Sequence, residues 1–298
     1  MTQSLLVPII LGHNQFFGVN HLSAAQGADR AIQFSDPTNI LKIIKDATEL
    51  GAGGLMLSTH QRAGQITELI LRDSKVLSEL VIYPLLPYIQ KYVTRANEIG
   101  MINVVLEELR DQNLRGKIAT LWTGSKGLLT KDINAILATL MRLELKAFRG
   151  LNVPVIFLHD ALTDLALALG LKDIFYFYLE EIEQVHGSKG AFTTKNAPLL
   201  LQKLSDWGLP DPIVMTHVNK LGFQMNPTRD ACLKSFAKHQ AEIVAMSTLA
   251  SGYLRPKEAF QFLSRVPEVK SVVVGASSRF HLEETFTQLR ATKIGEVL

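Results

Sequence analysis

The short apolar run at residues 153–160, Val-Pro-Val-Ile-Phe-Leu-His-Asp, constrains the fold of this chain more than any other stretch. It has no polar alternation, which is typical of a strand that is buried on both faces of a parallel sheet. It ends abruptly in His159 and Asp160. In an α/β barrel, polar residues at the C-terminal ends of the strands form the active face.

The same plan recurs along the chain, with helical patterns between the apolar runs. Candidate strands lie at 5–11, 54–58, 80–86, 117–121, 153–159, 190–194, 213–216, 243–247 and 271–274. Such alternation predicts a parallel sheet, and eight strands would close a TIM (β/α)8 barrel, so one candidate is surplus. The weakest is 80–86, which contains Pro84 and can instead belong to a helical insertion around 75–112. We expect a single α/β-barrel domain over 1–298.

The composition limits the class of partner. The chain has 298 residues with 31 basic and 28 acidic side chains, and this near-balance argues against a nucleic-acid-binding surface. No run of apolar residues is long enough to predict a membrane span. The single cysteine, Cys232, excludes an intramolecular disulfide and a Cys-rich metal site. Without a signal-peptide pattern at the start, we expect a cytoplasmic protein that acts on a small molecule.

Histidines gather at the predicted strand ends. His13, His60, His159 and His217 each follow an apolar run, and Asp160 follows His159. In a barrel these positions converge on one mouth. Imidazole acts there either as a general acid or base or as a metal ligand. A divalent metal held by the four histidines therefore remains open, although no His-x-His or His-Glu-x-x-His spacing supports it.

The loop at 274–279 is a candidate anion site. Gly275, Ser277, Ser278 and Arg279 precede a predicted helix. Free N–H groups at a helix N-terminus and an arginine favour a phosphate. The alternative is an ordinary helix cap by Ser277 or Ser278.

The C-terminal half resembles the aldo-keto reductases, in order from about 131 to 290. Residues 157–160 (FLHD) resemble the segment that carries the catalytic-site histidine, and residues 187–196 resemble the next strand, with Lys195 in place of a serine. Residues 245–252 (AMSTLASG) resemble the Ala-Tyr-Ser-Pro-Leu-x-x-Gly loop, and 274–278 the closing phosphate loop. The resemblance implies that NADP or NAD binds to Asn196, Ser247, Leu249, Gly252, Gly275, Ser277, Ser278 and Arg279.

The N-terminal half departs from the family at the reacting groups. One register places Met56 and Gln61 at the positions of the catalytic aspartate and tyrosine, and a shift by two places Ser58 and Ala63 there. The strand that ends at residue 121 lacks the family's lysine. Of the family's four catalytic residues, only His159 is retained. Since carbonyl reduction needs a proton donor, His159, His60 or His13 would have to take that role.

Three functions remain open on the sequence. The first is an atypical NAD(P)-linked oxidoreductase with a His-rich site. The second is a hydrolase or lyase that uses His13, His60, His159, Asp160 and His217, with or without a metal. The third is a non-catalytic ligand-binding barrel. An enzyme is favoured over the third, because unpaired polar groups are costly to keep buried at a mouth that binds nothing.

Overall fold

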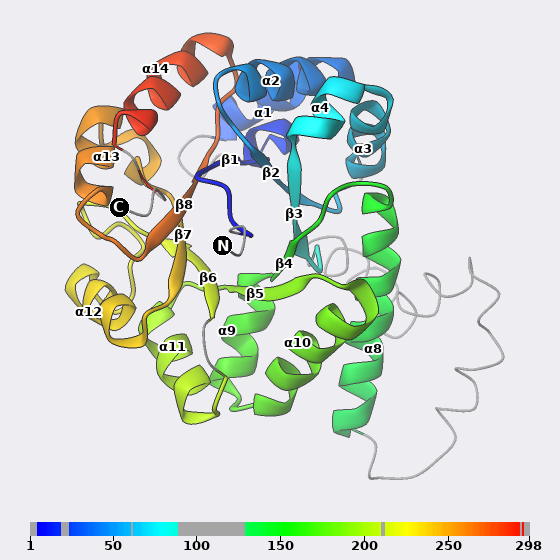
Figure 1. Cartoon of the computed structure of the whole chain (residues 1–298), viewed down its shortest axis with the longest axis vertical. Coiled ribbons are helices and arrows are strands. Elements are labelled where there is room, and N and C mark those ends of the chain that lie inside the picture. Colours follow the sequence, from blue (N-terminus) through cyan, green and yellow to red (C-terminus); the bar gives the residue numbers. More distant parts are fainter. Residues whose placement is uncertain are drawn as a thin grey trace, which may run out of the picture.

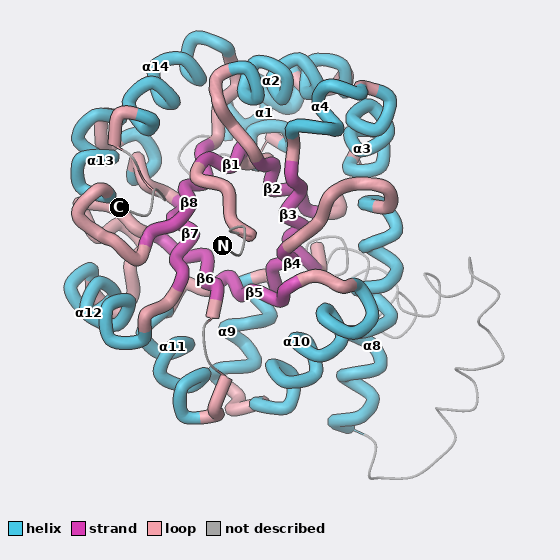
Figure 2. The backbone as a smooth tube through the Cα atoms, in the orientation of Figure 1, coloured by secondary structure: helices cyan, strands magenta, loops and turns pink. Residues whose placement is uncertain are grey.

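Eight parallel strands close into a barrel, with each strand hydrogen-bonded to its neighbours in chain order. The computed structural model describes residues 5–18, 24–60, 62–88, 129–209, 212–292 and 294. The strands are β1 (Ile9–Leu11), β2 (Gly54–Ser58), β3 (Val81–Leu86), β4 (Val155–Leu158), β5 (Lys189–Thr193), β6 (Ile213–His217), β7 (Glu242–Met246) and β8 (Val269–Val274). They form a central ring with helices outside it (Figures 1 and 2). The predicted TIM (β/α)8 barrel is confirmed.

The connections between strands are mostly helical. The α-helices are α1 (Ala24–Gln33), α2 (Pro37–Glu49), α3 (Ala63–Arg72), α4 (Ser74–Glu79), α8 (Leu129–Leu145), α9 (Asp160–Ala168), α10 (Lys172–His186), α11 (Ala197–Asp206), α12 (Arg229–His239), α13 (Pro256–Leu263) and α14 (Arg279–Arg290). Short 3-10 turns η1 (Asn14–Phe17), η2 (Lys146–Phe148) and η3 (Ala250–Gly252) complete the described elements. The start of α2 is fixed by a side-chain cap, because Asp36 accepts from the Thr38 N–H.

The assignment of 80–86 to a helical insertion is wrong. This segment is β3, which pairs with β2 on one side and β4 on the other. Pro84 is tolerated within it and lies opposite Leu57 in the register. Residues 89–112 of the proposed insertion and the candidate strand at 117–121 lie outside the described residues.

Two apolar clusters lie on opposite sides of the sheet. The inner one fills the barrel and takes alternate strand residues, including Ile10, Met56, Tyr83, Phe157, Ala191 and Met215. The outer one packs the other strand face against the helices and includes Leu57, Leu158, Phe192 and Val214. Both faces are therefore buried, which explains why the strands read as continuous apolar runs.

The segment before β1 covers one end of the barrel. Leu6 is 4% exposed and packs into the inner cluster. The Tyr83 hydroxyl donates to the Leu5 carbonyl at 2.9 Å and accepts from the Val7 N–H at 3.0 Å. Figure 1 shows the N-terminal trace inside the ring of strands. The side chains that follow the strands lie at the opposite end. Among the described helices, none combines the length and apolarity that crossing a bilayer requires.

Candidate active site at the C-terminal mouth of the barrel

The alternation along each strand identifies which polar side chains face the mouth. Phe157 on β4 and Ala191 on β5 are register partners within the inner cluster. Two residues later come His159, directly after β4, and Thr193, the last residue of β5. The ladder continues to that level, because the His159 N–H donates to the Leu86 carbonyl at 2.7 Å. By the same alternation Ser58 follows Met56, and His217 follows Met215. A polar layer of Ser58, His159, Thr193 and His217 therefore caps the apolar interior.

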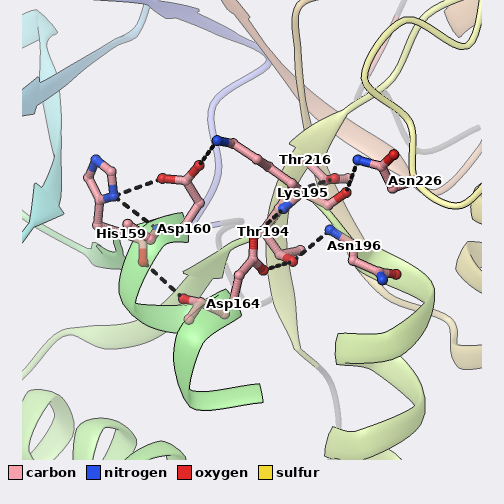
Figure 3. A network of polar contacts seen from close by, with 10 residues as sticks. His159, Asp160, Asp164, Thr194, Lys195, Asn196, Thr216 and Asn226 are labelled. Atoms are coloured by element: carbon pink, nitrogen blue, oxygen red, sulfur yellow. Dashed lines mark hydrogen bonds and ion pairs between the residues drawn. The ribbon is translucent and has the colours of Figure 1, made fainter. Parts of the chain in front are cut away.

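His159 is held by the residue that follows it. Its Nδ1 lies 2.7 Å from Asp160 Oδ1 and 3.2 Å from the Ala161 N–H (Figure 3). One nitrogen cannot donate to the first and accept from the second at the same time. The contact to the carboxylate is shorter and charge-assisted, so we assign the proton to Nδ1. This tautomer leaves Nε2 as the ring nitrogen that exchanges a proton with a ligand.

Asp160 connects His159 to Lys195. The Lys195 Nζ lies 3.4 Å from Asp160 Oδ2 (Figure 3). Burial by itself would raise the pKa of Asp160, but the hydrogen bond from His159 and the charges of His159 and Lys195 lower that pKa to about 2. Asp160 is therefore ionised at neutral pH and stabilises a proton on His159.

A second carboxylate fixes the backbone that carries Lys195. Asp164 accepts from the Thr194 hydroxyl at 2.5 Å and from the Lys195 N–H at 3.0 Å. On the other side of the same segment, Asn226 Nδ2 donates to the Lys195 carbonyl at 3.2 Å (Figure 3). These bonds hold the C-terminal end of β5 on both sides of the peptide chain.

His13 is fully engaged by hydrogen bonds. Its Nδ1 lies 3.1 Å from the Met56 carbonyl, and its Nε2 lies 3.1 Å from Ser58 Oγ. Because a carbonyl only accepts, Nδ1 carries the proton and Nε2 accepts from Ser58. Burial is the main cause that lowers the pKa of His13 to about 4. At neutral pH His13 is thus uncharged and serves to orient Ser58.

His60 belongs to an aromatic group beside His13. Phe17 stacks on the His60 ring, with ring centroids 4.0 Å apart, and Tyr88 approaches its edge at 5.6 Å. Burial and the nearby Arg62 lower the pKa of His60. The Tyr88 N–H donates to Glu144 Oε2 at 3.0 Å, which fixes the chain after β3. His60 is therefore a neutral imidazole within an aromatic surface.

The four histidines do not form a metal centre. Throughout the described ranges, which include all four, no three His, Cys, Asp or Glu side chains are arranged to hold a metal ion. His13 and His60 both contact the Phe17 ring. His159 instead pairs with Asp160, and His217 lies on β6 with an exposed fraction of 6%. The metal-dependent alternative has no support in this arrangement.

The residues that the family resemblance assigns to the cofactor follow β5, β7 and β8. Asn196 caps α11 by accepting from the Leu199 N–H through Oδ1, so its Nδ2 is the group suited to donate to an amide. In the loop after β7, Ser247, Ala250 and Ser251 all have positive φ angles, and Gly252 has a φ of 96°. Left-handed conformations in three non-glycine residues cost energy and are characteristic of functional loops. Leu249 lies in the same loop and is partly buried.

The polar groups of the loop after β8, residues 275–279, are largely bound by other groups of the chain. Ser278 caps α14, which was the alternative to the anion site, and the Ser277 carbonyl accepts from Gln33 Nε2 at 2.8 Å. A Cβ on Gly275 would lie 2.6 Å from Gln15 Oε1, so this glycine makes room for Gln15. The Arg279 guanidinium forms ion pairs with three carboxylates. They belong to Asp46 at 2.7 Å, Glu49 at 3.0 Å and Glu283 at 2.9 Å. These carboxylates, Glu49 foremost, raise the pKa of Arg279.

Three residues at the mouth were not singled out from the sequence as site residues. Ser58 and Thr193 face the barrel interior, and Tyr88 lies against His60. Side chains alternate between the two faces of a strand, so counting every second residue from an interior position would have identified Ser58 and Thr193. Correct assignment of 80–86 as the third strand would have identified Tyr88, because this strand and the residues after it end at 85–88 (Leu, Leu, Pro, Tyr). The family comparison had instead used the candidate strand that ends at 121. Residues 85–88 also lack a lysine.

Comparisons with known proteins support the fold. No protein-family model and no curated protein matches the chain. A candidate aldo-keto reductase from Pseudomonas aeruginosa superposes with a TM-score of 0.61 at 16% identity, covering 96% of this chain and 91% of that one. A candidate 2,5-diketo-D-gluconic acid reductase B gives a TM-score of 0.54 at 12% identity, with coverages of 97% and 89%. An aldo-keto reductase from Bacillus halodurans, in its holo form, gives 0.52 at 12%, with coverages of 85% and 82%. The chain therefore has the aldo-keto reductase fold.

Proposed function

We propose that the protein is an NAD(P)-linked oxidoreductase that acts on a small carbonyl or hydroxy compound with His159 as the proton donor and acceptor. The observation that carries this proposal is the 2.7 Å contact between His159 Nδ1 and Asp160 Oδ1 at the C-terminal end of β4. A partly buried carboxylate on one ring nitrogen prepares the other nitrogen for proton transfer.

The chain's own part in the reaction is the proton. A bound reduced nicotinamide would supply a hydride to the carbonyl carbon. His159, protonated on both nitrogens, gives its Nε2 proton to the carbonyl oxygen and becomes neutral, while Nδ1–H stays on Asp160. Oxidation of the alcohol runs in reverse, with neutral His159 accepting the hydroxyl proton. Asp160 stabilises the charged ring and fixes its orientation.

The other imidazoles are less suited to this role. Both ring nitrogens of His13 are bonded within the protein, and its low pKa keeps it neutral. His60 also has a lowered pKa and accepts weakly from the Arg62 N–H at 3.4 Å through Nδ1. We assign both to the wall of the site rather than to proton transfer.

The nicotinamide end of a cofactor fits the residues that are present. Asn196 Nδ2 and the left-handed loop at 247–252 lie at the ends of β5 and β7 and would hold the amide and the adjoining sugar. The phosphate end fits less well, since Arg279 is already bound to three carboxylates. We therefore propose a nicotinamide cofactor and expect NADH to bind better than NADPH.

One observation favours the hydrolase alternative. Ser58 Oγ, His13 Nε2 and the Met56 carbonyl form a chain of 3.1 Å contacts, which resembles a nucleophile, a base and an orienting group. However, a base with a pKa of about 4 takes up a proton weakly at neutral pH, and Ser58 is only 2% exposed. The oxidoreductase remains the better-supported function.

The test is a titration with NADH and NADPH, followed by assays of hydride transfer against a panel of small aldehydes, ketones and oxo acids. Binding should quench the cofactor fluorescence, and His159→Gln should lower kcat/KM about 100-fold or more, the usual contribution of general acid catalysis. His239→Gln, at the C-terminal end of α12 where the side chain is partly exposed, serves as the matched control and should retain activity. Absence of binding for both cofactors at millimolar concentration would overturn the proposal.

A further inference from the structure

We propose that Lys195 and Thr193 form a subsite for a carboxylate of the substrate. This inference rests on the proposed function and deepens it, because it names the substrate class as small oxo or hydroxy acids. Thr193 is the last residue of β5, in phase with the inward-facing Ala191, and Lys195 follows it by two residues. The family resemblance has a serine at the position of Lys195, so the cation is a departure from that pattern.

Thr193 presents a buried hydroxyl to which the described part of the chain offers no hydrogen-bond partner. Its side chain is 2% exposed, and Oγ1 has no hydrogen-bond partner among the described residues. Burying an unpaired hydroxyl is energetically costly, so such a group calls for an explanation. Since Thr193 faces the interior above Ala191, a ligand oxygen at the mouth would satisfy it.

Lys195 supplies a cation two residues after Thr193. Its backbone is fixed by Asp164 and Asn226, whereas its side chain is 61% exposed. The ammonium has three donors, and its described contact is the 3.4 Å pair with Asp160. Figure 3 shows the Lys195 side chain extending from β5 toward Asp160 and His159. The remaining donors are therefore available to a substrate anion close to the proposed proton donor.

The strand register places this subsite next to the reacting group. Phe157 pairs with Ala191, and two residues further on the same ladder sets His159 beside Thr193. Likewise Thr193 pairs with Met215 on β6. A carboxylate held by Lys195 and Thr193 thus lies one strand away from His159. A carbonyl carbon bonded to that carboxylate carbon would be within reach of the imidazole.

The local charge limits the substrate to a single negative charge. The ionisable side chains described around the subsite are Lys195, Asp160, Asp164, His13, His60, His159 and His217. With neutral imidazoles, Lys195 and Asp160 cancel each other, and an ionised Asp164 adds one negative charge behind the Lys195 backbone. A bound carboxylate increases this negative charge, and a proton on His159 reduces it. Substrate binding therefore favours the protonated histidine that the reduction requires.

The test compares lactate with lactamide, which have the same shape but differ in charge. Binding is followed by ligand-observed NMR on the protein without cofactor, so the result does not depend on whether a nicotinamide binds. Lactate should bind with a Kd of about 1 mM, a value reasonable for a ligand of this size, and lactamide at least tenfold more weakly.

Variants then assign the binding to the subsite. Lys195→Met should weaken lactate binding tenfold or more, Lys195→Arg should retain it, and Thr193→Val should weaken it several-fold. Lys189→Met, at the opposite end of the same strand, is the matched control and should bind like the unmodified protein. Equal binding of lactate and lactamide, or unchanged lactate binding in Lys195→Met, would overturn the proposal. Failure of NADH and NADPH to bind would instead remove the proposed oxidoreductase and leave this result standing.

Discussion

Glu144 Oε2 accepts a hydrogen bond of 2.6 Å from the Thr59 hydroxyl and thereby joins α8 to the loop after β2. The same carboxylate accepts from the Tyr88 N–H at the end of β3. Glu144 is 4% exposed. A single buried side chain thus fixes the two loops that carry His60 and Tyr88.

Glu144→Gln should lower the free energy of unfolding by about 1–3 kcal/mol, since an amide group replaces one accepting oxygen with a donor. Chemical denaturation measures the change. Glu79→Gln, at the exposed end of α4, is the control and should change the free energy by less than about 0.5 kcal/mol. If both variants unfold alike, Glu144 does not hold these loops.

His13 should make the protein less stable in mild acid. Its pKa is about 4 in the folded chain against 6.5 for an ordinary histidine. Between these values the unfolded chain binds the proton more readily, so the free energy of unfolding falls as pH is lowered from 6.5 to 4. The full effect is about 3 kcal/mol.

Denaturation curves at pH 7 and pH 4.5 test this prediction. His13→Gln should show a smaller loss of stability between the two pH values than the unmodified protein, although it is less stable at pH 7. His281→Gln, at the exposed start of α14, should keep the original pH dependence. An unchanged dependence in His13→Gln would show that other groups cause the acid sensitivity.

Gly275 should not tolerate a side chain while Gln15 is present. Gln15 is 4% exposed and donates to the Gly12 carbonyl at 2.6 Å. A Cβ at position 275 would meet its Oε1 at 2.6 Å. Gly275→Ala should therefore cost about 1–3 kcal/mol in the free energy of unfolding.

A double-mutant cycle isolates the contact between Gly275 and Gln15. In the Gln15→Ala background, the cost of Gly275→Ala should fall to well under half. Gly64→Ala is the control: the position lies in α3 with no atom within 4 Å of an added Cβ, and the helix should gain up to about 1 kcal/mol. Equal costs of Gly275→Ala in both backgrounds would mean that Gln15 is not the obstacle.

The sequence predicted the barrel well and the composition of its mouth only in part. Seven of the strands were placed correctly because their apolar runs end in polar residues. The third strand, β3, was assigned to a helical insertion because it contains Pro84. Runs buried on both faces carry no alternation, so Thr193 could not be told from Thr194, although the first faces the interior and the second bonds to Asp164. Side-chain pairing such as His13 with Ser58 joins two strands and leaves no local signal.

Arg279 should make NADPH no better a ligand than NADH. An arginine that follows the last strand would attract a 2′-phosphate, but here Glu49 and Glu283 accompany Asp46 around the guanidinium. The group therefore sits in a locally negative environment, and a phosphate would have to displace a carboxylate.

Removing those charges should reverse the preference. The double variant Glu49→Gln and Glu283→Gln should improve NADPH binding relative to NADH about 5- to 10-fold at low salt, because each exposed pair contributes up to about 1 kcal/mol. Added salt should reduce the difference, since both carboxylates are about half exposed. Glu284→Gln is the matched control on α14 and should leave the ratio unchanged. If the unmodified protein already binds NADPH tenfold more tightly than NADH, the carboxylates do not neutralise Arg279 toward the cofactor, and the phosphate is held elsewhere.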